Sequence, residues 1–272
     1  MYRYLTLTLS LVLLFVSNAV AQETSGNPLL DDDWIIRLGA TEIDAEVKVG
    51  LANPELGSIP LIDLDKLGVD AGFTSFWTHV IWQAPERWSW GFNYFRSEAD
   101  GEHLTDEDIE FGDLTIPAGS GVKSDFVTNF YVLNGYYDFY QSPNSHAGVG
   151  FGLYGLDLDL KLQAVVGNEA GATAESASVL APLPTLSLYY KHAFNEKLAL
   201  WTDVGYFSLD IDNYDGDMLA ARLNLEYWVK KKWGFGIGYN FVDLDLTVDK
   251  PVFDQMYDVS WNAYNVYFTM GF

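Results

Sequence analysis

Apolar and polar residues alternate along most of the chain with a period of two. In the segment 233–241, the odd positions are Trp, Phe, Ile, Tyr and Phe, whereas the even positions are Gly, Gly, Gly and Asn. The segments 217–229 and 264–272 alternate in the same way. Because successive side chains of a strand point to opposite faces, this period predicts β-strands with one apolar face.

Ten segments carry this pattern, and the connections between them alternate in length. An even number of amphipathic strands of about ten residues, joined alternately by short turns and long loops, is typical of a transmembrane β-barrel. We therefore predict an all-β fold, an antiparallel transmembrane β-barrel with ten strands, and eight strands as the alternative. The predicted strands are 34–46, 69–83, 88–97, 123–140, 146–162, 182–194, 198–211, 217–229, 233–248 and 258–272. The long connections are 47–68, 98–122, 163–181 and 249–257.

Pairing across the turns supports this arrangement. Antiparallel partners must lie on the same face of the sheet, and a pairing register that violated this rule would mix lipid-facing and lumen-facing residues. An Asp215–Gly216 hairpin also satisfies the rule, and the predicted register places Glu226 opposite Gly205 and Gly236. The predicted pairs are Tyr140 with His146, Phe194 with Leu198, Val229 with Trp233, and Tyr214 with Asp217.

The N-terminal residues predict export. Arg3 precedes an apolar stretch from Leu5 to Val16, and the sequence Ala19-Val20-Ala21 matches a signal-peptidase site. We expect residues 1–21 to be a cleaved signal peptide, residues 22–33 a short periplasmic segment, and residues 34–272 the barrel. The expected location is the outer membrane of a Gram-negative bacterium.

Composition narrows the choice of partners and chemistry. The formal net charge of -23 argues against nucleic acid, which is bound by basic surfaces. The absence of Cys excludes disulfides, thiolate zinc sites and Cys nucleophiles. Mean hydropathy is only +0.02 although 16% of the residues are aromatic, as expected when lipid-facing apolar residues alternate with polar ones. Aromatic residues also gather beside the short turns, as in a periplasmic girdle: Trp82, Trp88, Trp90, Phe139, Tyr140, Tyr190, Phe194, Tyr227 and Trp233.

Two features resemble known proteins. The last strand ends on Phe272 and resembles the signal read by the barrel assembly machinery, with Tyr264, Val266, Phe268, Met270 and Phe272 on one face. The segments Ile62–Asp70, Ile109–Asp113 and Ile116–Gly119 resemble a family of bacterial outer-membrane β-barrel proteins that has no assigned chemistry. This resemblance implies a barrel in the outer membrane. The expected partners are membrane lipid, lipopolysaccharide and, during insertion, the assembly machinery.

An Asp-x-Asp motif recurs at three predicted extracellular strand ends: Asp157 and Asp159, Asp210 and Asp212, and Asp243 and Asp245. A β-bulge there would turn the carboxylates into the mouth of the pore, where they could select cations or hold Ca²⁺ or Mg²⁺. Without a bulge, they would face outward above the bilayer, and Leu156, Leu158 and Leu244 would line an apolar interior. In a third interpretation they only solvate the strands and contact divalent ions that bridge lipopolysaccharide.

The predicted lumen is polar and charged. Charged groups in a narrow barrel pair and fill it, so we expect a plugged lumen rather than a conducting pore. The predicted lumen residues are Lys191, Asp203, Arg222, Asn224, Glu226, Asn240 and Asn265.

Catalysis finds little support. The segment Lys191–Asn195 faintly resembles the His-Ser-Asn region of lipid A deacylases, but Ala193 replaces the Ser. We expect His79, His146 and His192 near the periplasmic end, and His103 in an acidic loop. The expected function is therefore a structural or surface role without enzymatic activity and without a cofactor. The alternatives are a narrow channel or carrier for small cations or apolar solutes, and a barrel enzyme that hydrolyses lipid or peptide.

Overall fold

The computed structural model describes residues 25–52, 62–63, 73–104, 106, 108–111, 114–166, 169–211, 213–249 and 254–272. The predicted signal peptide and most of the segment 62–70 lie outside the described residues. The first described element is a short helix, α2 (Pro28–Asp31). The long strands are β1 (Trp34–Ala52), β3 (Phe73–Gln83), β4 (Trp88–Leu104), β7 (Gly121–Ser142), β8 (Ser145–Val166), β9 (Glu169–Ala193), β10 (Leu198–Ile211), β11 (Tyr214–Lys230), β12 (Trp233–Val248) and β13 (Asp254–Gly271). The short strands are β2 (Ile62–Asp63), β5 (Ile109–Phe111) and β6 (Leu114–Ile116).

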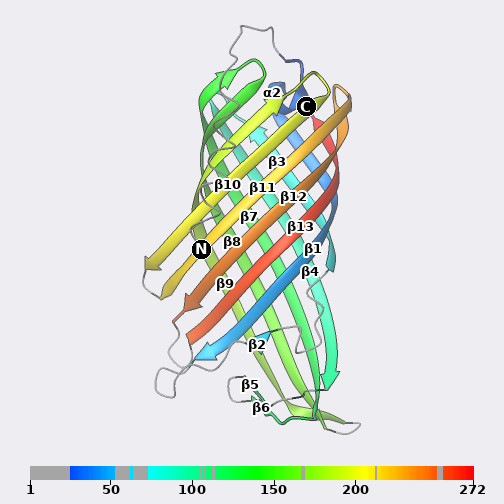
Figure 1. The fold of residues 1–272 in the computed structure, drawn as a ribbon, viewed down its shortest axis with the longest axis vertical. Helices are drawn as coiled ribbons and strands as arrows, with labels where there is room; N and C mark the ends of the chain where they lie inside the picture. Colours follow the sequence, from blue (N-terminus) through cyan, green and yellow to red (C-terminus); the bar gives the residue numbers. More distant parts are fainter. Residues whose placement is uncertain are drawn as a thin grey trace.

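The ten long strands form a closed antiparallel barrel (Figure 1). Neighbours in the sequence pair with each other, and β13 closes the sheet by pairing with β1 from Gly271 opposite Ile35 to Asp254 opposite Ala52. Closure pairs every long strand on both sides over part of its length, as a sheet in lipid requires. Towards the other end, β9 before Leu186 pairs with β8 only, and β4 after Phe95 pairs with β7 only. The ten-stranded barrel predicted from the alternation is therefore confirmed.

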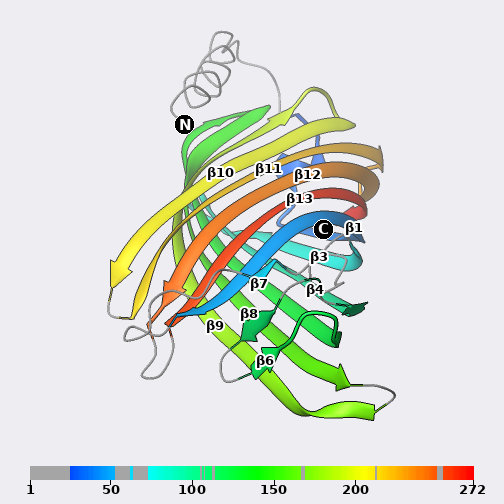
Figure 2. The ribbon, with the colours of Figure 1, turned by 60° about the horizontal axis from the view of Figure 1, so that its bottom comes forward.

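The two ends of the barrel differ (Figures 1 and 2). The short turns, α2 and the C-terminus lie at one end, at the top of Figure 1, and we call it the periplasmic end. At the other, extracellular end, β4, β7, β8 and β9 reach beyond the remaining strands, and the β5–β6 hairpin lies beside them. Among the described residues, no helix is long and apolar enough to cross a membrane.

One predicted long loop is wrong. The segment 163–181 belongs almost entirely to the sheet, because β8 continues to Val166 and β9 begins at Glu169. Residues 169–178 are mostly Ala, Ser, Gly and Glu, so they show no apolar alternation. Pairing with β8, rather than an amphipathic pattern of its own, determines the conformation of this segment.

The predicted Asp215–Gly216 hairpin is also wrong. Tyr214 pairs with Ile211 instead of Asp217, so Gly216 lies within β11. A Cβ atom on Gly216 would lie 2.3 Å from the carbonyl oxygen of Asp245, so this glycine permits close strand contact rather than a turn. Glu226 consequently pairs with Ala199 and not Gly205, although its predicted partner Gly236 is confirmed. Because the partner of Tyr214 moves by an even number of residues, every side chain keeps its predicted face.

Two β-bulges adjust the register beside the periplasmic turns. One lies between Asp138 and Tyr140 and the other between Trp228 and Lys230. Next to these turns, the predicted pairs Tyr140–His146 and Val229–Trp233 are therefore wrong by one residue. Beyond the bulges, the residues predicted to face the lumen still face it. The predicted Phe194–Leu198 pair is joined by a backbone hydrogen bond of 2.9 Å.

The two faces of the barrel wall exchange polarity along the strands: the outer face changes from apolar to acidic, and the inner face changes from polar to apolar. On the lipid-facing side of β12, Phe235 and Ile237 are exposed, and Asp243 and Asp245 follow towards the extracellular end. On its inner side, Gly and Asn positions give way to buried Val242, Leu244, Leu246 and Val248. The register of β12 with β13 shows no bulge at this exchange. The strand therefore continues above the bilayer with an apolar interior and an acidic exterior.

Strand length explains this arrangement. The apolar belt of an outer-membrane barrel is about 25 Å tall, and a tilted strand of about ten residues spans it. β12 has 16 residues and β9 has 25, so both extend beyond such a belt. Exposed aromatic residues mark the belt at both levels: Trp34, Trp82, Trp88, Trp90, Phe139, Tyr140, Phe194 and Tyr227 at the periplasmic end, and Tyr131, Tyr206, Tyr239 and Tyr264 further along the strands.

Candidate functional site: the charged network in the lumen

The periplasmic half of the lumen is filled by polar side chains from inward-facing strand positions. The alternation of each strand directs every second residue inward, so distant parts of the sequence meet inside the barrel. Lys191, Asp203, Asn224 and Glu226 are all buried, at 4% exposure or less. Arg222 and Asn240 are partly buried and line a small cavity in the lumen. The structure thus places all seven predicted lumen residues, Asn265 included, inside the barrel.

The deepest ion pair joins Arg37 of β1 to Glu226 of β11. Arg37 Nε donates to Glu226 Oε1 at 2.6 Å, and both side chains are fully buried. Tyr267 also donates to Glu226 Oε1, at 3.3 Å. Arg37 Nη1 lies 3.2 Å from His79 Nδ1. Because a guanidinium can only donate, Nδ1 of His79 is the acceptor, and a neutral His79 carries its proton on Nε2.

A second ion pair joins Arg222 of β11 to Asp203 of β10. Its two hydrogen bonds are both 2.7 Å long and run from Arg222 Nε to Oδ1 and from Nη2 to Oδ2. Nη2 also donates to the hydroxyl of Tyr136, at 2.9 Å. Such bidentate, charge-assisted pairs are among the strongest polar contacts in proteins and fix the guanidinium plane.

The Trp201 ring connects the two pairs. Its centroid lies 5.0 Å from Cζ of Arg37 and 5.1 Å from Cζ of Arg222, so one indole contacts both guanidinium groups. Trp201 itself is 1% exposed. The sequence interpretation did not include this residue. The available signal was its position among predicted lumen residues, since Trp201 pairs with Lys191 on one side and Asn224 on the other.

Helix α2 closes the periplasmic end of the lumen. The side chain of Asn27 caps it by accepting from Leu29 N at 3.0 Å, and Leu29 is buried against Ala199 and Trp201. Gln83 holds the helix to the wall, because its Nε2 donates to the carbonyl oxygens of Leu29 and Asp32. The predicted periplasmic segment 22–33 is therefore partly folded into the barrel. Burial raises the pKa of the neighbouring Asp32 carboxyl, an effect that Lys232 opposes.

Lys191 also takes part in closing the periplasmic end of the lumen. Its Nζ donates to Gln83 Oε1 at 3.1 Å and lies 5.9 Å from the ring centroid of Tyr189. Gln83 therefore links the charged lumen to α2 through both ends of its amide. A separate apolar cluster of Ile35, Ile81 and Trp228 is buried at the same end.

The described Asp-x-Asp carboxylates do not line a pore mouth. Asp210, Asp243 and Asp245 are exposed on the outer wall, whereas Leu244 is 1% exposed inside. The first geometry considered from the sequence, with a bulge and inward carboxylates, is therefore wrong for β12. The reason is the uninterrupted strand register.

Asp157 and Asp159, the first pair of the motif, contact polar side chains. Asp157 accepts from Asn129 Nδ2 at 3.3 Å, and Asp159 lies 3.7 Å from Nζ of Lys161. Asp212 lies outside the described residues, as do the side chains of Leu156 and Leu158. Within the part of the chain that is described, no three His, Asp or Glu side chains form a group that could hold a metal ion.

The histidines occupy the expected ends of the barrel. His79 lies in the network, His146 Nδ1 lies 3.2 Å from Asp138 Oδ2, and His103 is exposed at the extracellular end of β4. A pair that the sequence did not reveal joins Ser145 Oγ to His192 Nδ1 at 2.7 Å, at the periplasmic end. The described residues give His192 no carboxylate partner, so the pair lacks the third group that orients a catalytic His.

Comparisons with known proteins identify the fold. No family model and no curated protein matches the chain. Among solved structures, the outer membrane protease OmpT from Escherichia coli is similar with a TM-score of 0.63 and 11% sequence identity, over 89% of this chain and 97% of that chain. The outer membrane protein OprG from Pseudomonas aeruginosa matches with a TM-score of 0.39 and 13% identity, over 92% of this chain and 99% of that chain. The toluene transporter TodX from P. putida matches with a TM-score of 0.36 and 10% identity, over 90% of this chain and 92% of that chain. The similarity to OmpT shows that the chain has the fold of an outer-membrane β-barrel.

Proposed function

We propose that this chain is an outer-membrane barrel protein with a closed lumen, and that its role is structural, at the cell surface, rather than catalytic. The observation that carries the proposal is the contact of Trp201 with two buried ion pairs inside the barrel. This closure lies within the belt of lipid-facing residues. The fold, the apolar belt and the signal-peptide pattern of residues 1–21 support an outer-membrane location.

The extracellular half supports a surface role. Its outer wall carries Asp217, Asp245 and Asp258 directly opposite one another on β11, β12 and β13. Like charges in this arrangement repel each other and favour contact with solvent or cations. We expect this wall to lie in the lipopolysaccharide layer, where Ca²⁺ or Mg²⁺ would join protein carboxylates to lipid phosphates.

Single-channel recording in planar lipid bilayers tests the proposal, with a porin reconstituted in the same way as a positive control. We expect the wild-type protein to show no discrete openings. Trp201→Ala removes the ring between the two guanidinium groups and is the variant in which openings should appear first. Tyr206→Ala removes an exposed aromatic side chain of the same strand and is the matched control. Discrete openings of the wild-type protein would overturn the closed-lumen proposal.

A carrier for small apolar solutes is the second candidate, because the extracellular half of the lumen is apolar. Trp77, Phe95, Phe130, Tyr154 and Trp261 line the same small cavity as Arg222 and Asn240, where the apolar and the polar parts of the lumen meet. Its volume is ≈ 30 Å³, enough for about one water molecule, whereas small-molecule sites have volumes of about 300–1,000 Å³. The packing of this half therefore favours a filled interior over a binding site.

An enzymatic role has candidate groups at two places, and in the part of the chain that is described neither has a carboxylate partner. His103 is exposed at a strand end, and the Ser145–His192 pair lies at the periplasmic end without a carboxylate. We expect His103→Ala and Ser145→Ala to leave any hydrolysis of lipopolysaccharide or peptide unchanged. A loss of hydrolysis in either variant would contradict the non-enzymatic proposal.

A further inference from the structure

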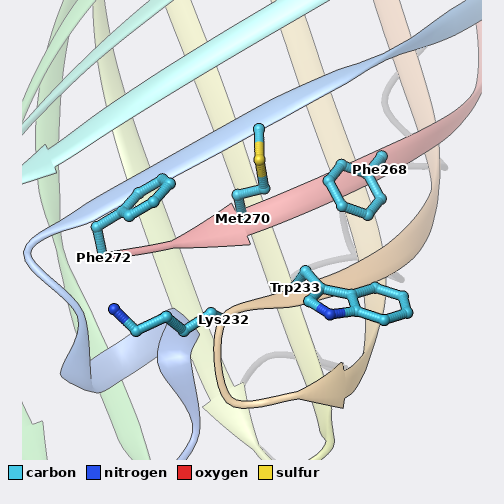
Figure 3. Close-up of a pocket in the computed structure, with 5 residues that line it drawn as sticks. All are labelled: Lys232, Trp233, Phe268, Met270 and Phe272. Carbon is cyan, nitrogen blue, oxygen red and sulfur yellow. The ribbon is translucent and has the colours of Figure 1, made fainter.

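An open groove lies on the outer wall at the periplasmic end of β12 and β13. Its volume is ≈ 390 Å³, and it is lined by Lys232, Trp233, Phe268, Met270 and Phe272 (Figure 3). Four of these side chains are apolar, and the one charged side chain lies at the periplasmic edge. Figure 3 shows the ammonium of Lys232 directed towards the ring of Phe272.

The backbone holds this groove in a fixed geometry. Gly271 N donates to the carbonyl oxygen of Lys232 at 3.1 Å, which ties the β11–β12 turn to the end of β13. Phe272 is tied in turn to Trp34 of β1 by two backbone hydrogen bonds, of 3.0 and 3.1 Å. The groove is therefore a feature of the closed barrel rather than of a loose terminus.

The side chains on the outer face of the groove are suited to acyl chains. The rings of Trp233 and Phe268 stack with centroids 5.9 Å apart, and Phe235 packs edge-on against both. Phe235 and Val266, the next outward-facing residues, are 53% and 66% exposed and belong to the lipid-facing belt. Hydrocarbon of the bilayer must cover this surface, because the apolar belt is continuous with it.

The charged side chains at the edge of the groove are suited to the anionic head group of a lipid. The turns at this end carry exposed Lys230, Lys231 and Lys232, and the carbonyl of Lys197 in the next turn accepts from Trp228 N at 2.7 Å. Among the described residues, no carboxylate lies within 4 Å of the ammonium groups of these four lysines. Lys232 acts electrostatically on the carboxyl of Asp32.

The lysines of the extracellular half differ. Lys48, Lys123 and Lys161 each have a carboxylate partner, at 2.5, 3.9 and 3.7 Å respectively. In a chain with a net charge of -23, the exposed lysines that lack such a partner among the described residues are thus gathered at one membrane surface, next to an apolar groove. This arrangement complements a ligand with an anionic head and an apolar tail.

We propose that this groove binds an anionic phospholipid of the periplasmic leaflet, with its phosphate at Lys232 and one acyl chain along Met270, Phe268 and Trp233. Lys230, Lys231 and Lys197 then supply further attraction to the head group. The cation–π contact between Lys232 and Phe272, with Nζ 5.8 Å from the ring centroid, keeps the ammonium above the entrance of the groove. This proposal is independent of whether the lumen conducts.

Native mass spectrometry of the protein in detergent micelles tests the proposal, with dioleoyl phosphatidylglycerol and dioleoyl phosphatidylcholine as probes. We expect the wild-type protein to retain phosphatidylglycerol in preference to phosphatidylcholine. Lys232→Ala should weaken phosphatidylglycerol binding about fivefold, the value expected for one basic residue at a membrane surface. Lys232→Arg should restore it, and Lys161→Ala, at the opposite end of the barrel, should leave it unchanged.

Several outcomes would overturn the proposal. They are equal retention of the two phospholipids, unchanged phosphatidylglycerol binding in Lys232→Ala, and displacement of phosphatidylglycerol by glycerol 3-phosphate, which has no acyl chain. Preferential retention of lipid A would reassign the groove to a lipid of the other leaflet and overturn it too. If Lys232→Ala does not fold, a salt titration of the wild-type protein decides instead. Phosphatidylglycerol should be released as ionic strength rises while phosphatidylcholine is not, and a salt-independent preference would count against the proposal.

Discussion

The Arg37–Glu226 pair allows a quantitative test of the lumen network. Glu226→Ala removes the carboxylate that accepts from Arg37 Nε at 2.6 Å and from Tyr267 at 3.3 Å, and it leaves the guanidinium fully buried. Two unit charges about 4 Å apart interact by about 4 kcal/mol at an effective dielectric constant of 20. Removing one partner of a buried pair costs about 3–5 kcal/mol, because the remaining charge is uncompensated. We therefore expect Glu226→Ala to lower the free energy of unfolding by about 4 kcal/mol.

Equilibrium unfolding in urea, with the protein refolded in lipid vesicles and followed by tryptophan fluorescence, measures this loss. The double variant Arg37→Met/Glu226→Leu should unfold close to the wild type, because apolar residues of similar size can replace a buried ion pair. The matched control is Glu98→Ala, which removes the partner of Arg96 in an ion pair on the exposed outer wall. If Glu226→Ala were no more destabilising than Glu98→Ala, the full burial of the Arg37–Glu226 pair would be refuted.

Three further predictions use the same unfolding measurement. Leu244→Asp places a carboxylate at a position only 1% exposed, and it should lower the free energy of unfolding by more than about 3 kcal/mol. Asp243→Asn on the outer wall should change it by less than about 0.5 kcal/mol. Equal effects of the two variants would contradict the exchange of faces. Gly216→Ala places a Cβ atom 2.3 Å from a backbone oxygen of β12, and it should lower the free energy of unfolding by about 1–3 kcal/mol. Gly155→Ala, whose Cβ atom would have its nearest neighbour at 3.7 Å, should be tolerated. Similar urea midpoints of the two variants would refute the close approach of β11 and β12 at Gly216. Leu29→Ala should cost about 2–5 kcal/mol, and an unchanged midpoint would mean that α2 is not part of the folded barrel.

Much of the fold could be predicted because a barrel in lipid imposes a simple pattern. A lipid-facing strand needs an apolar residue at every second position, and this requirement is visible without an alignment. The strand β10 (Leu198–Ile211) begins and ends where the alternation predicts, as does β12. The inward position of Glu226 opposite Gly236 also followed from parity alone.

The errors arose where that requirement is absent. Residues 169–181 lie in a part of the sheet with little apolar alternation, so their strand was missed. The Asp215–Gly216 hairpin was inferred from turn chemistry, but Gly216 is required by the approach of β12. Trp201 and α2 were missed because their role depends on contacts between distant segments, and periodicity contains no information about which segments meet in the lumen.

The exchange of faces links the acidic exterior to the closed lumen that we propose. Arg222 pairs with Asn240, and one step further towards the extracellular end Ala220 pairs with Val242, so the polar interior ends at the same level on adjacent strands. At that level Phe241 is the last large apolar residue on the outer face of β12, and Asp243 is the next residue on that face. A bulge would have shifted the alternation of a single strand, whereas here the backbone alternation is continuous and the chemistry of both faces changes. The same strands therefore behave as a membrane barrel below this level and as the wall of a water-soluble barrel above it. In the closed-lumen proposal, the apolar interior that the described residues form above this level separates the polar network from the extracellular side, as a barrel that anchors a surface without conducting requires.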